Sequence, residues 1–212
     1  MFSFLTRKPA NSLPATLTLF PLGATLFPGG RLSLKVFEQR YIDLAKARTA
    51  DGELFGIVTL TSGGEVGAEQ SFAQVGTAVR VRSFDMPQAG IFMLDVVAED
   101  RFEITGKTTE NNGLHKASVR WIRPEPALRL PSAYAGLGVL LGQIIARTGP
   151  ERFAEPVALD DATWVGSRLV EMLQLPPAIK QTLLEINDAE LRLKTVKQLL
   201  DRGSGGGNAR PS

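Results

Sequence analysis

The sequence contains no cysteine and only one histidine, His115, among its 212 residues. The absence of cysteine excludes disulfide bonds, thiolate zinc sites, iron–sulfur clusters and a cysteine nucleophile. A single histidine excludes any site that needs two imidazoles from one chain, and only His115 could serve as the base of a serine triad. We therefore expect no metal and no cofactor, and the sequence assigns no catalytic residue.

An excess of charge of one sign and a long apolar run are also missing. The 24 basic residues exceed the 22 acidic ones by two, which is weak evidence for a polyanionic partner. The uncharged run 130–146 contains a proline and three glycines, and it is marginal for a membrane span of about 20 apolar residues. We interpret it as a buried helix. With no signal-peptide pattern at the N-terminus, the prediction is a cytoplasmic protein without a membrane segment.

Hydrophobic residues make up 43% of the chain and charged residues 22%, which is enough to form a core and remain soluble. The pattern changes near residues 124–126, where two prolines flank a glutamate. Before this point short strand-like runs are separated by turn residues, and after it the periodicity is helical. The predicted class is therefore α+β, with strands first and helices second.

The N-terminal part, residues 13–123, is predicted to form a small β-barrel with one early helix. Apolar and polar residues alternate, as half-buried antiparallel strands require, over 31–36, 79–84, 101–105 and 116–121. Residues 54–60 and 91–97 are more continuously apolar, residues 38–48 have a helical pattern, and residues 61–71 look like a mobile loop. Turn residues at 86–90 and 111–113 indicate hairpins. Closure into a barrel would remove exposed sheet edges.

The C-terminal part, residues 124–202, is predicted to form a bundle of three or four helices, followed by a disordered tail over 203–212. The first helix covers 131–147, and Asp160 or Asp161 can cap the second. Pro177 can start the third. Asp188 can cap the fourth, in which apolar residues fall on one face at Ala189, Leu193, Val196 and Leu200.

Sequence fragments that suggest chemistry are incomplete. Gly106-Lys107-Thr108 resembles the end of a phosphate-binding loop, but the earlier glycine and the following helix are missing. The glycines of 136–142 fit close helix packing better than a dinucleotide fingerprint. His115 shares a strand face with apolar residues, so we expect it to be packed. The pairs Glu99-Asp100 and Asp160-Asp161 suit turn and cap positions better than acid–base chemistry.

Charge is distributed unevenly along the chain. Residues 1–50 carry seven basic and two acidic groups, whereas residues 51–100 carry two basic and eight acidic groups. Solvated strand faces explain most of this pattern. The best single binding candidate is the stripe of Arg80, Arg82 and Phe84, because the alternation puts two guanidinium groups and an aromatic ring on one face. Such a face can bind nucleic acid or peptide.

A series of phrases resembles the N-terminal domain of the ATP-dependent Lon protease. The most specific are LTLFPL at 17–22, LFPG at 26–29 and LSLKVFEQRY at 32–41. Later matches are FGIV at 55–58, VGTA at 75–78, DRFEI at 100–104, LPP at 175–177 and KQTLLE at 180–185. The resemblance covers about residues 13–202. It implies a PUA-like β-barrel followed by a helical bundle, used for recognition of substrates or partners.

Within these phrases, spacing and side-chain chemistry suggest mostly architectural roles for single residues. Phe37 and Tyr41 would pack together at i and i+4 of the early helix, and Glu38 and Arg40 would tie that helix to the barrel or lie exposed. No nucleotide loop is present, and the chain has no room for the AAA+ and serine–lysine peptidase modules of the protease. The expectation is therefore a stand-alone Lon N-domain protein that is not an enzyme.

Three functions remain open at this point. The first is non-enzymatic recognition of exposed polypeptide segments or of a protein partner, in an apolar groove between barrel and helices. The second is RNA binding through Arg80, Arg82 and Phe84, because PUA-like barrels also bind RNA. The third is an enzyme with a cryptic site where carboxylates, or serine and lysine, converge. The oligomeric state is left open.

Overall fold

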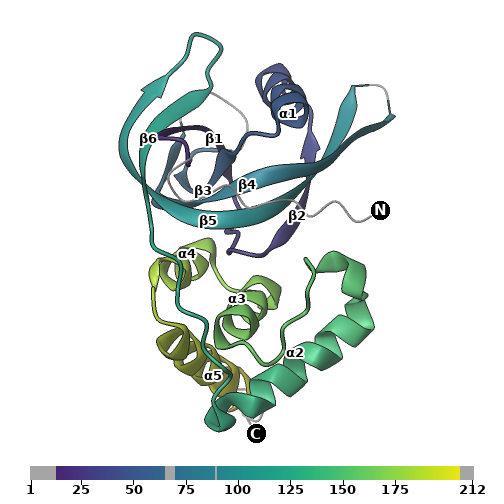
Figure 1. Ribbon diagram of the computed structural model, residues 1–212, viewed down its shortest axis with the longest axis vertical. Coiled ribbons are helices and arrows are strands. Elements are labelled where there is room, and N and C mark those ends of the chain that lie inside the picture. Colours follow the sequence, from purple (N-terminus) through teal and green to yellow (C-terminus); the bar gives the residue numbers. More distant parts are fainter. Residues whose placement is uncertain (1–12, 65–69, 89, 206–212) are drawn as a thin grey trace, which may run out of the picture.

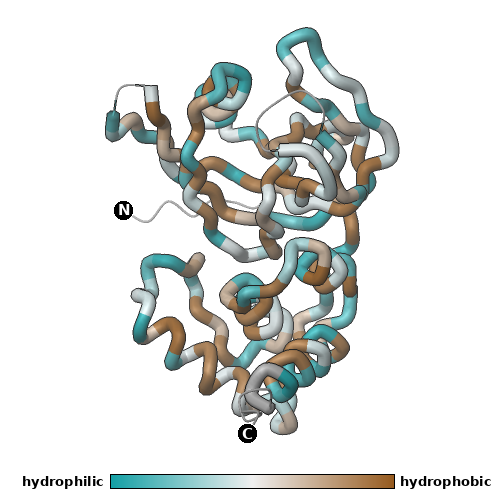
Figure 2. The backbone as a smooth tube through the Cα atoms, turned by 180° about the vertical axis from the view of Figure 1, so that it is seen from behind, coloured by the Kyte–Doolittle hydropathy of each residue, from teal (hydrophilic) through white to brown (hydrophobic). Residues whose placement is uncertain are grey.

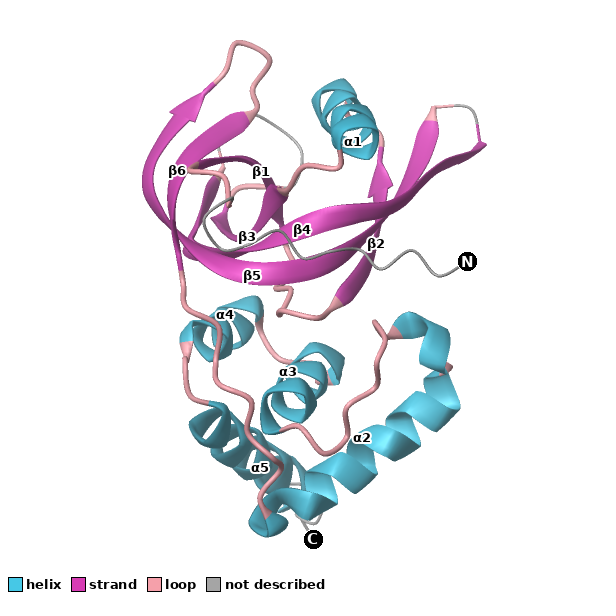
Figure 3. Cartoon of the chain, viewed as in Figure 1, coloured by secondary structure: helices cyan, strands magenta, loops and turns pink. Residues whose placement is uncertain are grey.

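The protein consists of a strand-rich upper unit and a helical lower unit (Figures 1 and 3). The computed structural model describes residues 13–64, 70–88 and 90–205, with side chains to residue 202. Parts of the predicted loop 61–71 (65–69), of the hairpin turn 86–90 (residue 89) and of the predicted tail (206–212) lie outside the described residues. The predicted α+β class is confirmed.

The strands form one mixed sheet, and five of them close into a ring. The strands are β1 (Thr16–Leu22), β2 (Arg31–Val36), β3 (Phe55–Ser62), β4 (Ser71–Gln88), β5 (Ile91–Thr109) and β6 (His115–Trp121). Pairing follows the order β2-β5-β4-β3-β1-β6, and a further pairing of β6 with β5 completes the ring. Only the β1–β3 pair is parallel among these pairings. The barrel is therefore not closed along its whole length, because β2 stands outside the ring on the first half of β5.

Two hydrophobic clusters stabilise the strand-rich unit. One takes members from all five ring strands and fills the ring around Phe102, which is fully buried. The other lies between the sheet and helix α1 (Gln39–Asp51), and includes Phe20, Leu34 and Tyr41. Apolar residues thus face two cores, whereas the β5–β6 hairpin at the top of the molecule is largely hydrophilic (Figure 2).

The helical unit begins with a single turn, η2 (Ser132–Tyr134), which leads into α2 (Ala135–Thr148). A second turn, η3 (Pro150–Arg152), precedes α3 (Ala162–Met172), α4 (Pro177–Glu185) and α5 (Ala189–Gly205). Two predicted helix caps are confirmed: of the alternatives Asp160 and Asp161, the Asp161 carboxylate accepts from Trp164 N–H (2.7 Å), and the Asp188 carboxylate accepts from Leu191 N–H (2.9 Å). Helix α4 starts at Pro177 as predicted, whereas the helix predicted over 131–147 becomes α-helical only at Ala135. Helix α5 continues through Gly205, so the first three residues of the predicted tail are helical.

Phe27 joins the two units. It lies between β1 and β2 in the sequence, yet its ring is only 1% exposed and packs in the hydrophobic cluster of the helices. Its backbone N–H donates to the Glu171 carboxylate (2.9 Å), and the buried Arg168 guanidinium donates to the carbonyls of Phe27 (3.3 Å) and Pro28 (3.0 Å). Burial raises the pKa of Glu171, and the neighbouring Arg168 opposes that rise. The barrel thus inserts a side chain into the helical core.

A buried ionic cluster makes a second connection between the units. The Glu125 carboxylate accepts hydrogen bonds from both terminal nitrogens of Arg192, one of them at 3.0 Å. It also forms an ion pair with Arg101 of β5 at 3.4 Å. Arg101 also donates to the carbonyls of Leu184 (2.6 Å) and Ile186 (3.2 Å). Removal of one partner from such a cluster leaves a buried charge without compensation. The segment between barrel and bundle is therefore anchored to both units.

No helix in the described ranges has both the length and the apolar character that a bilayer crossing requires.

Candidate functional site

Strand β2 presents an open edge of the sheet. Its residues pair in continuous antiparallel register with β5, from Arg31 opposite Val97 to Val36 opposite Phe92. On the other side of β2, no strand of the described chain is paired. Ala98 N–H donates to the carbonyl of Gly30 (2.8 Å), so the backbone carbonyl of residue 30 points toward β5. The direction of the backbone N–H and C=O groups alternates along an antiparallel strand. Those of residues 32, 34 and 36 therefore also point toward β5, and those of residues 31, 33 and 35 point toward the open edge.

An apolar groove runs along the same strand. We call it the β2 groove; it has a volume of about 270 Å³ and is lined by Phe20, Leu22, Ala24, residues 32–38 and Tyr41. It is smaller than the roughly 300–1,000 Å³ typical of small-molecule sites. The size suits individual side chains of a larger partner better than a whole small ligand.

Phe37 and Tyr41 have different roles in this groove. Helix α1 begins at Gln39, so Phe37 precedes the helix, and its side chain is 56% exposed at the rim. The Tyr41 ring is buried and stacks on Phe20, with ring centroids 4.0 Å apart. Phe37 is therefore not on the helix, as the predicted i, i+4 spacing required, and the ring stacked on Tyr41 is that of Phe20 from β1.

Polar contacts hold β2 and α1 in place behind the groove. Asp95 of β5 accepts hydrogen bonds from Ser33 Oγ and from Arg31 (3.1 Å). The hydrogen bond from Ser33 is the main reason that the pKa of Asp95 is lowered, and Arg31 adds to the effect. At the start of α1, Arg40 pairs with Glu38 (3.1 Å) and donates to the carbonyl of Gly113 (2.7 Å). Glu38 and Arg40 thus tie the helix to the barrel, one of the two predicted alternatives.

The predicted stripe of Arg80, Arg82 and Phe84 does not lie on one face. Register between β4 and β5 shifts between Val81 and Ser83, so the alternation is reversed beyond that bulge. Phe84 therefore packs against the core cluster under α1 and stacks on Phe92 (centroids 5.0 Å apart). Arg80 donates to the carbonyl of Gly52 and pairs with Glu99 (3.4 Å), and Arg82 is exposed. A role of these residues in RNA binding stays a prediction.

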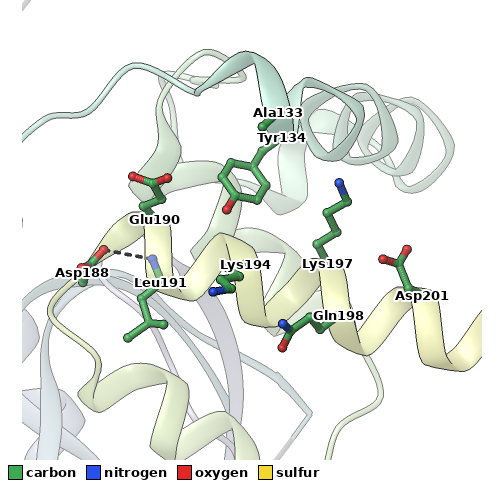
Figure 4. A pocket seen from close by; sticks show the side chains of 9 residues that line it. All are labelled: Ala133, Tyr134, Asp188, Glu190, Leu191, Lys194, Lys197, Gln198 and Asp201. Carbon is green, nitrogen blue, oxygen red and sulfur yellow. Dashed lines mark hydrogen bonds between the residues drawn. The ribbon is translucent and has the colours of Figure 1, made fainter.

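A second hollow lies on the helical unit, between η2 and α5 (Figure 4). It has a volume of about 570 Å³, and its lining includes charged side chains of both signs from α5: Glu190, Lys194, Lys197 and Asp201. In Figure 4 the Tyr134 ring lies above the helix between these charges. Surface charges of mixed sign are typical of a solvated helix face, and we assign this hollow no ligand.

The described residues provide no cluster of side chains for metal binding. Among residues 13–64, 70–88 and 90–202, no group of three or more histidine, aspartate or glutamate side chains could hold a metal ion. His115 is packed as expected: it is buried, its Nδ1 lies 3.0 Å from Thr109 Oγ1, and burial lowers its pKa. The Gly106-Lys107-Thr108 segment lies within strand β5 and precedes a hairpin, not a helix.

The β2 groove is the site that sequence reasoning missed. The alternation of 31–36 indicates a strand, but it does not show that β2 lies at a sheet edge. An available signal was Phe37, a large aromatic residue that follows the alternating run and has no place in it. The groove predicted between barrel and helices is also not where this one lies, because its lining comes from β1, β2 and α1.

Comparisons with known proteins agree with the architecture. The chain is 28% identical over 202 residues to the Lon protease of Anaeromyxobacter dehalogenans (strain 2CP-C) and, at the same identity and length, to Lon protease 2 of Myxococcus xanthus. Each alignment covers 91% of this chain and 24% of the relative. The chain thus spans about a quarter of the length of these curated relatives.

Solved structures also point to N-terminal domains of Lon proteases. A Lon N-terminal domain protein from Xanthomonas campestris is 31% identical, with a TM-score of 0.71 over 86% of this chain and 97% of that one. The N-terminal domain of the Lon protease of the Mycobacterium avium complex shares the fold at 16% identity, with a TM-score of 0.54 over 85% of this chain and 95% of that one. Residues 16–202 match the substrate-binding domain of the ATP-dependent protease La (LON). With a β-barrel and a helical unit both inside that match, the chain belongs to the LON substrate-binding domain family.

Proposed function

We propose that this protein binds exposed apolar segments of other polypeptides in the β2 groove and catalyses no reaction itself. The observation that carries the proposal is an apolar groove beside an open strand edge, in a member of a substrate-binding family. Extended segments are recognised in this way when main-chain hydrogen bonds supply affinity and side-chain pockets supply selectivity.

The rim of the groove supports this choice. Phe37 exposes 56% of its surface although it is large and aromatic, and aromatic side chains contribute strongly to binding when a partner covers them. Behind it, Leu34, Val36 and Tyr41 are buried and fixed by the core under α1. The groove thus combines a rigid floor with an aromatic side chain that a partner can cover.

A matched pair of variants tests the site. Phe37→Asp puts a charge at the rim of the apolar groove, and burial of that charge by a bound segment is costly. Val139→Asp makes the same kind of change at a more exposed apolar residue on α2, 62% exposed and outside the groove. The probe is reduced and alkylated lysozyme, which cannot refold, and native lysozyme is the control.

We expect the wild type and Val139→Asp to bind the unfolded probe equally, and Phe37→Asp to bind it at least tenfold more weakly in calorimetry or fluorescence anisotropy. None should bind native lysozyme. Equal binding of the unfolded probe by all three proteins would exclude the β2 groove as the binding site. Absence of binding by the wild type would exclude the proposed function.

The non-enzymatic part of the proposal has its own readout. It is supported by the match to the substrate-binding domain of relatives that are about four times longer. The unfolded probe should remain intact on gels after prolonged incubation with this protein, with or without ATP and magnesium.

We place the function in the cytoplasm, where newly made chains expose apolar segments.

A further inference from the structure

The open edge of β2 has unused backbone groups beside the groove. Residues 31, 33 and 35 direct their N–H and C=O groups away from β5, and no described strand pairs with them. Unpaired groups at a sheet edge act as a template for another strand. A segment lying along β2 would therefore find hydrogen-bonding groups at alternate residues and the groove on one side.

The two faces of β2 differ in chemistry. The side chains of Leu32, Leu34 and Val36 line the groove with apolar surface and join the core cluster. The alternate side chains, of Arg31, Ser33 and Lys35, lie on the opposite face, since side chains alternate along a strand. A strand added to this edge continues both faces, so every second side chain would enter the groove and the others would extend the polar face.

Charge on the polar face selects among such segments. Arg31 is already paired with Asp95 at 3.1 Å. Lys35, in contrast, is exposed and makes no ion pair with any residue that the structure describes. Opposite charges on neighbouring strands attract, and like charges repel. An acidic side chain on the added strand would therefore complement Lys35.

We infer that the β2 groove takes its ligand as an additional β-strand on β2, a segment with apolar residues at alternate positions and an acidic residue beside Lys35. This inference rests on the proposed function, because it specifies how and which segments the groove binds. It also gives the groove its selectivity: segments with proline, which lacks an amide N–H, or with a basic residue beside Lys35 bind more weakly.

The first test uses a nine-residue peptide with leucine or valine at its even positions and aspartate or serine at its odd positions. Two N-methylated forms are compared, one methylated at the odd residues and the other at the even residues. In an added strand the amides of only one set face β2. We expect one form to lose at least tenfold in affinity while the other stays within twofold of the parent peptide.

Which form loses affinity also gives the direction of the strand. Groups of the odd, polar residues face β2 in an antiparallel pair, and those of the even residues in a parallel pair. Equal effects of both methylation patterns, or no effect of either, would overturn strand addition. Loss of parent-peptide binding in Phe37→Asp would then still support the groove as the binding site, so the two proposals fail separately.

The second test exchanges charges. Lys35→Glu should lower the affinity for the aspartate-containing peptide several-fold and raise the affinity for a peptide with lysine at the same odd positions. Added salt should reduce both effects. Lys197→Glu, on α5 and far from the groove, is the matched control and should change neither affinity. If Lys35→Glu and Lys197→Glu have equal effects, the acidic selectivity is wrong. A different result would assign the open edge to a second copy of the chain and overturn the proposal. In that case the protein would bind no peptide but would self-associate, and Phe37→Asp would abolish the self-association.

Discussion

Asp95 forms a small polar centre on the outer face of β2, β5 and β4. Its carboxylate accepts from Ser33 of β2, from Arg31 of β2 at 3.1 Å and from Ser83 of β4 at 3.4 Å. One side chain on the middle strand thus connects three strands. This arrangement fixes β2 without using the backbone groups of its open edge.

Asp95→Asn should lower the free energy of unfolding by about 1 kcal/mol at pH 7, the usual net contribution of a hydrogen bond. The pKa of Asp95 is lowered in the folded protein, so its stabilising effect is present above the ordinary aspartate pKa of about 3.9 and is lost as the pH falls below it. Urea unfolding at pH 7 and pH 3 measures the change. The difference from the wild type should shrink at pH 3.

Asp85→Asn is the control, since Asp85 is exposed on the same face of β4. It should change stability little at either pH. A destabilisation by Asp95→Asn that is the same at both pH values would show that packing, rather than the ionised carboxylate, is responsible.

Single residues differ in how far the sequence predicts their role. Asp161 and Asp188 could be identified as helix caps because their partners are three residues away. The role of Asp95 could not, because its partners Ser33 and Arg31 are 62 and 64 residues away in the sequence. The position of Phe37 on the helix was predicted wrongly, because α1 starts two residues after Phe37.

Among the elements, strand β4 depends on close approach to its neighbours. At Gly76 an added Cβ atom would lie 2.5 Å from the carbonyl oxygen of Ile57 and 2.7 Å from Phe102 Cζ. The ring of Phe102 is fully buried inside the barrel, so it can move only if the surrounding core moves as well. Glycine therefore allows the strands to pass around that ring.

Gly76→Ala should destabilise the protein by about 1–3 kcal/mol, the range for overpacking a core. Gly106→Ala is the matched change on β5, where an added Cβ meets nothing within 4 Å and the φ angle is not in the left-handed region. Thermal unfolding followed by circular dichroism compares the two. A similar midpoint for both variants would show that the barrel adjusts to the extra methyl group.

Elements were predicted well where the pattern is local and poorly where it depends on partners. Alternation located β2, the middle of β4 and β6, and periodicity located the helices. The bulge between Val81 and Ser83 leaves no mark in the alternation, because it is defined by the register against β5. The open edge of β2 likewise follows from strand order, which single-strand patterns do not contain.

At the scale of the whole molecule, the barrel and the helices share a core. Phe27 places its ring among α3, α5 and the other members of the helical cluster, and the Arg192 guanidinium lies 5.9 Å from the ring centroid. Each unit also contains one tryptophan, Trp121 on β6 and Trp164 on α3. The two residues can therefore report on the two units separately.

We expect the Trp121→Phe and Trp164→Phe proteins, each with one remaining tryptophan, to show coincident urea transitions. Phe27→Ala added to each protein should lower the free energy of unfolding by about 3–5 kcal/mol, as is usual for a buried aromatic residue. It should also separate the two transitions. Phe153→Ala removes a ring from the same cluster but within the helical unit itself, and should shift both signals together. Separate transitions without the Phe27 change would mean that the units are independent.

The contribution of Phe27 also limits how the chain can be dissected. In the sequence, the boundary near residue 124 separates barrel from bundle, but in space the helical core is completed by a residue almost a hundred positions earlier. A fragment cut at that boundary would carry a vacancy in its helices, and the matching barrel fragment would display an unprotected aromatic ring. We therefore expect the two parts to fold together as one unit.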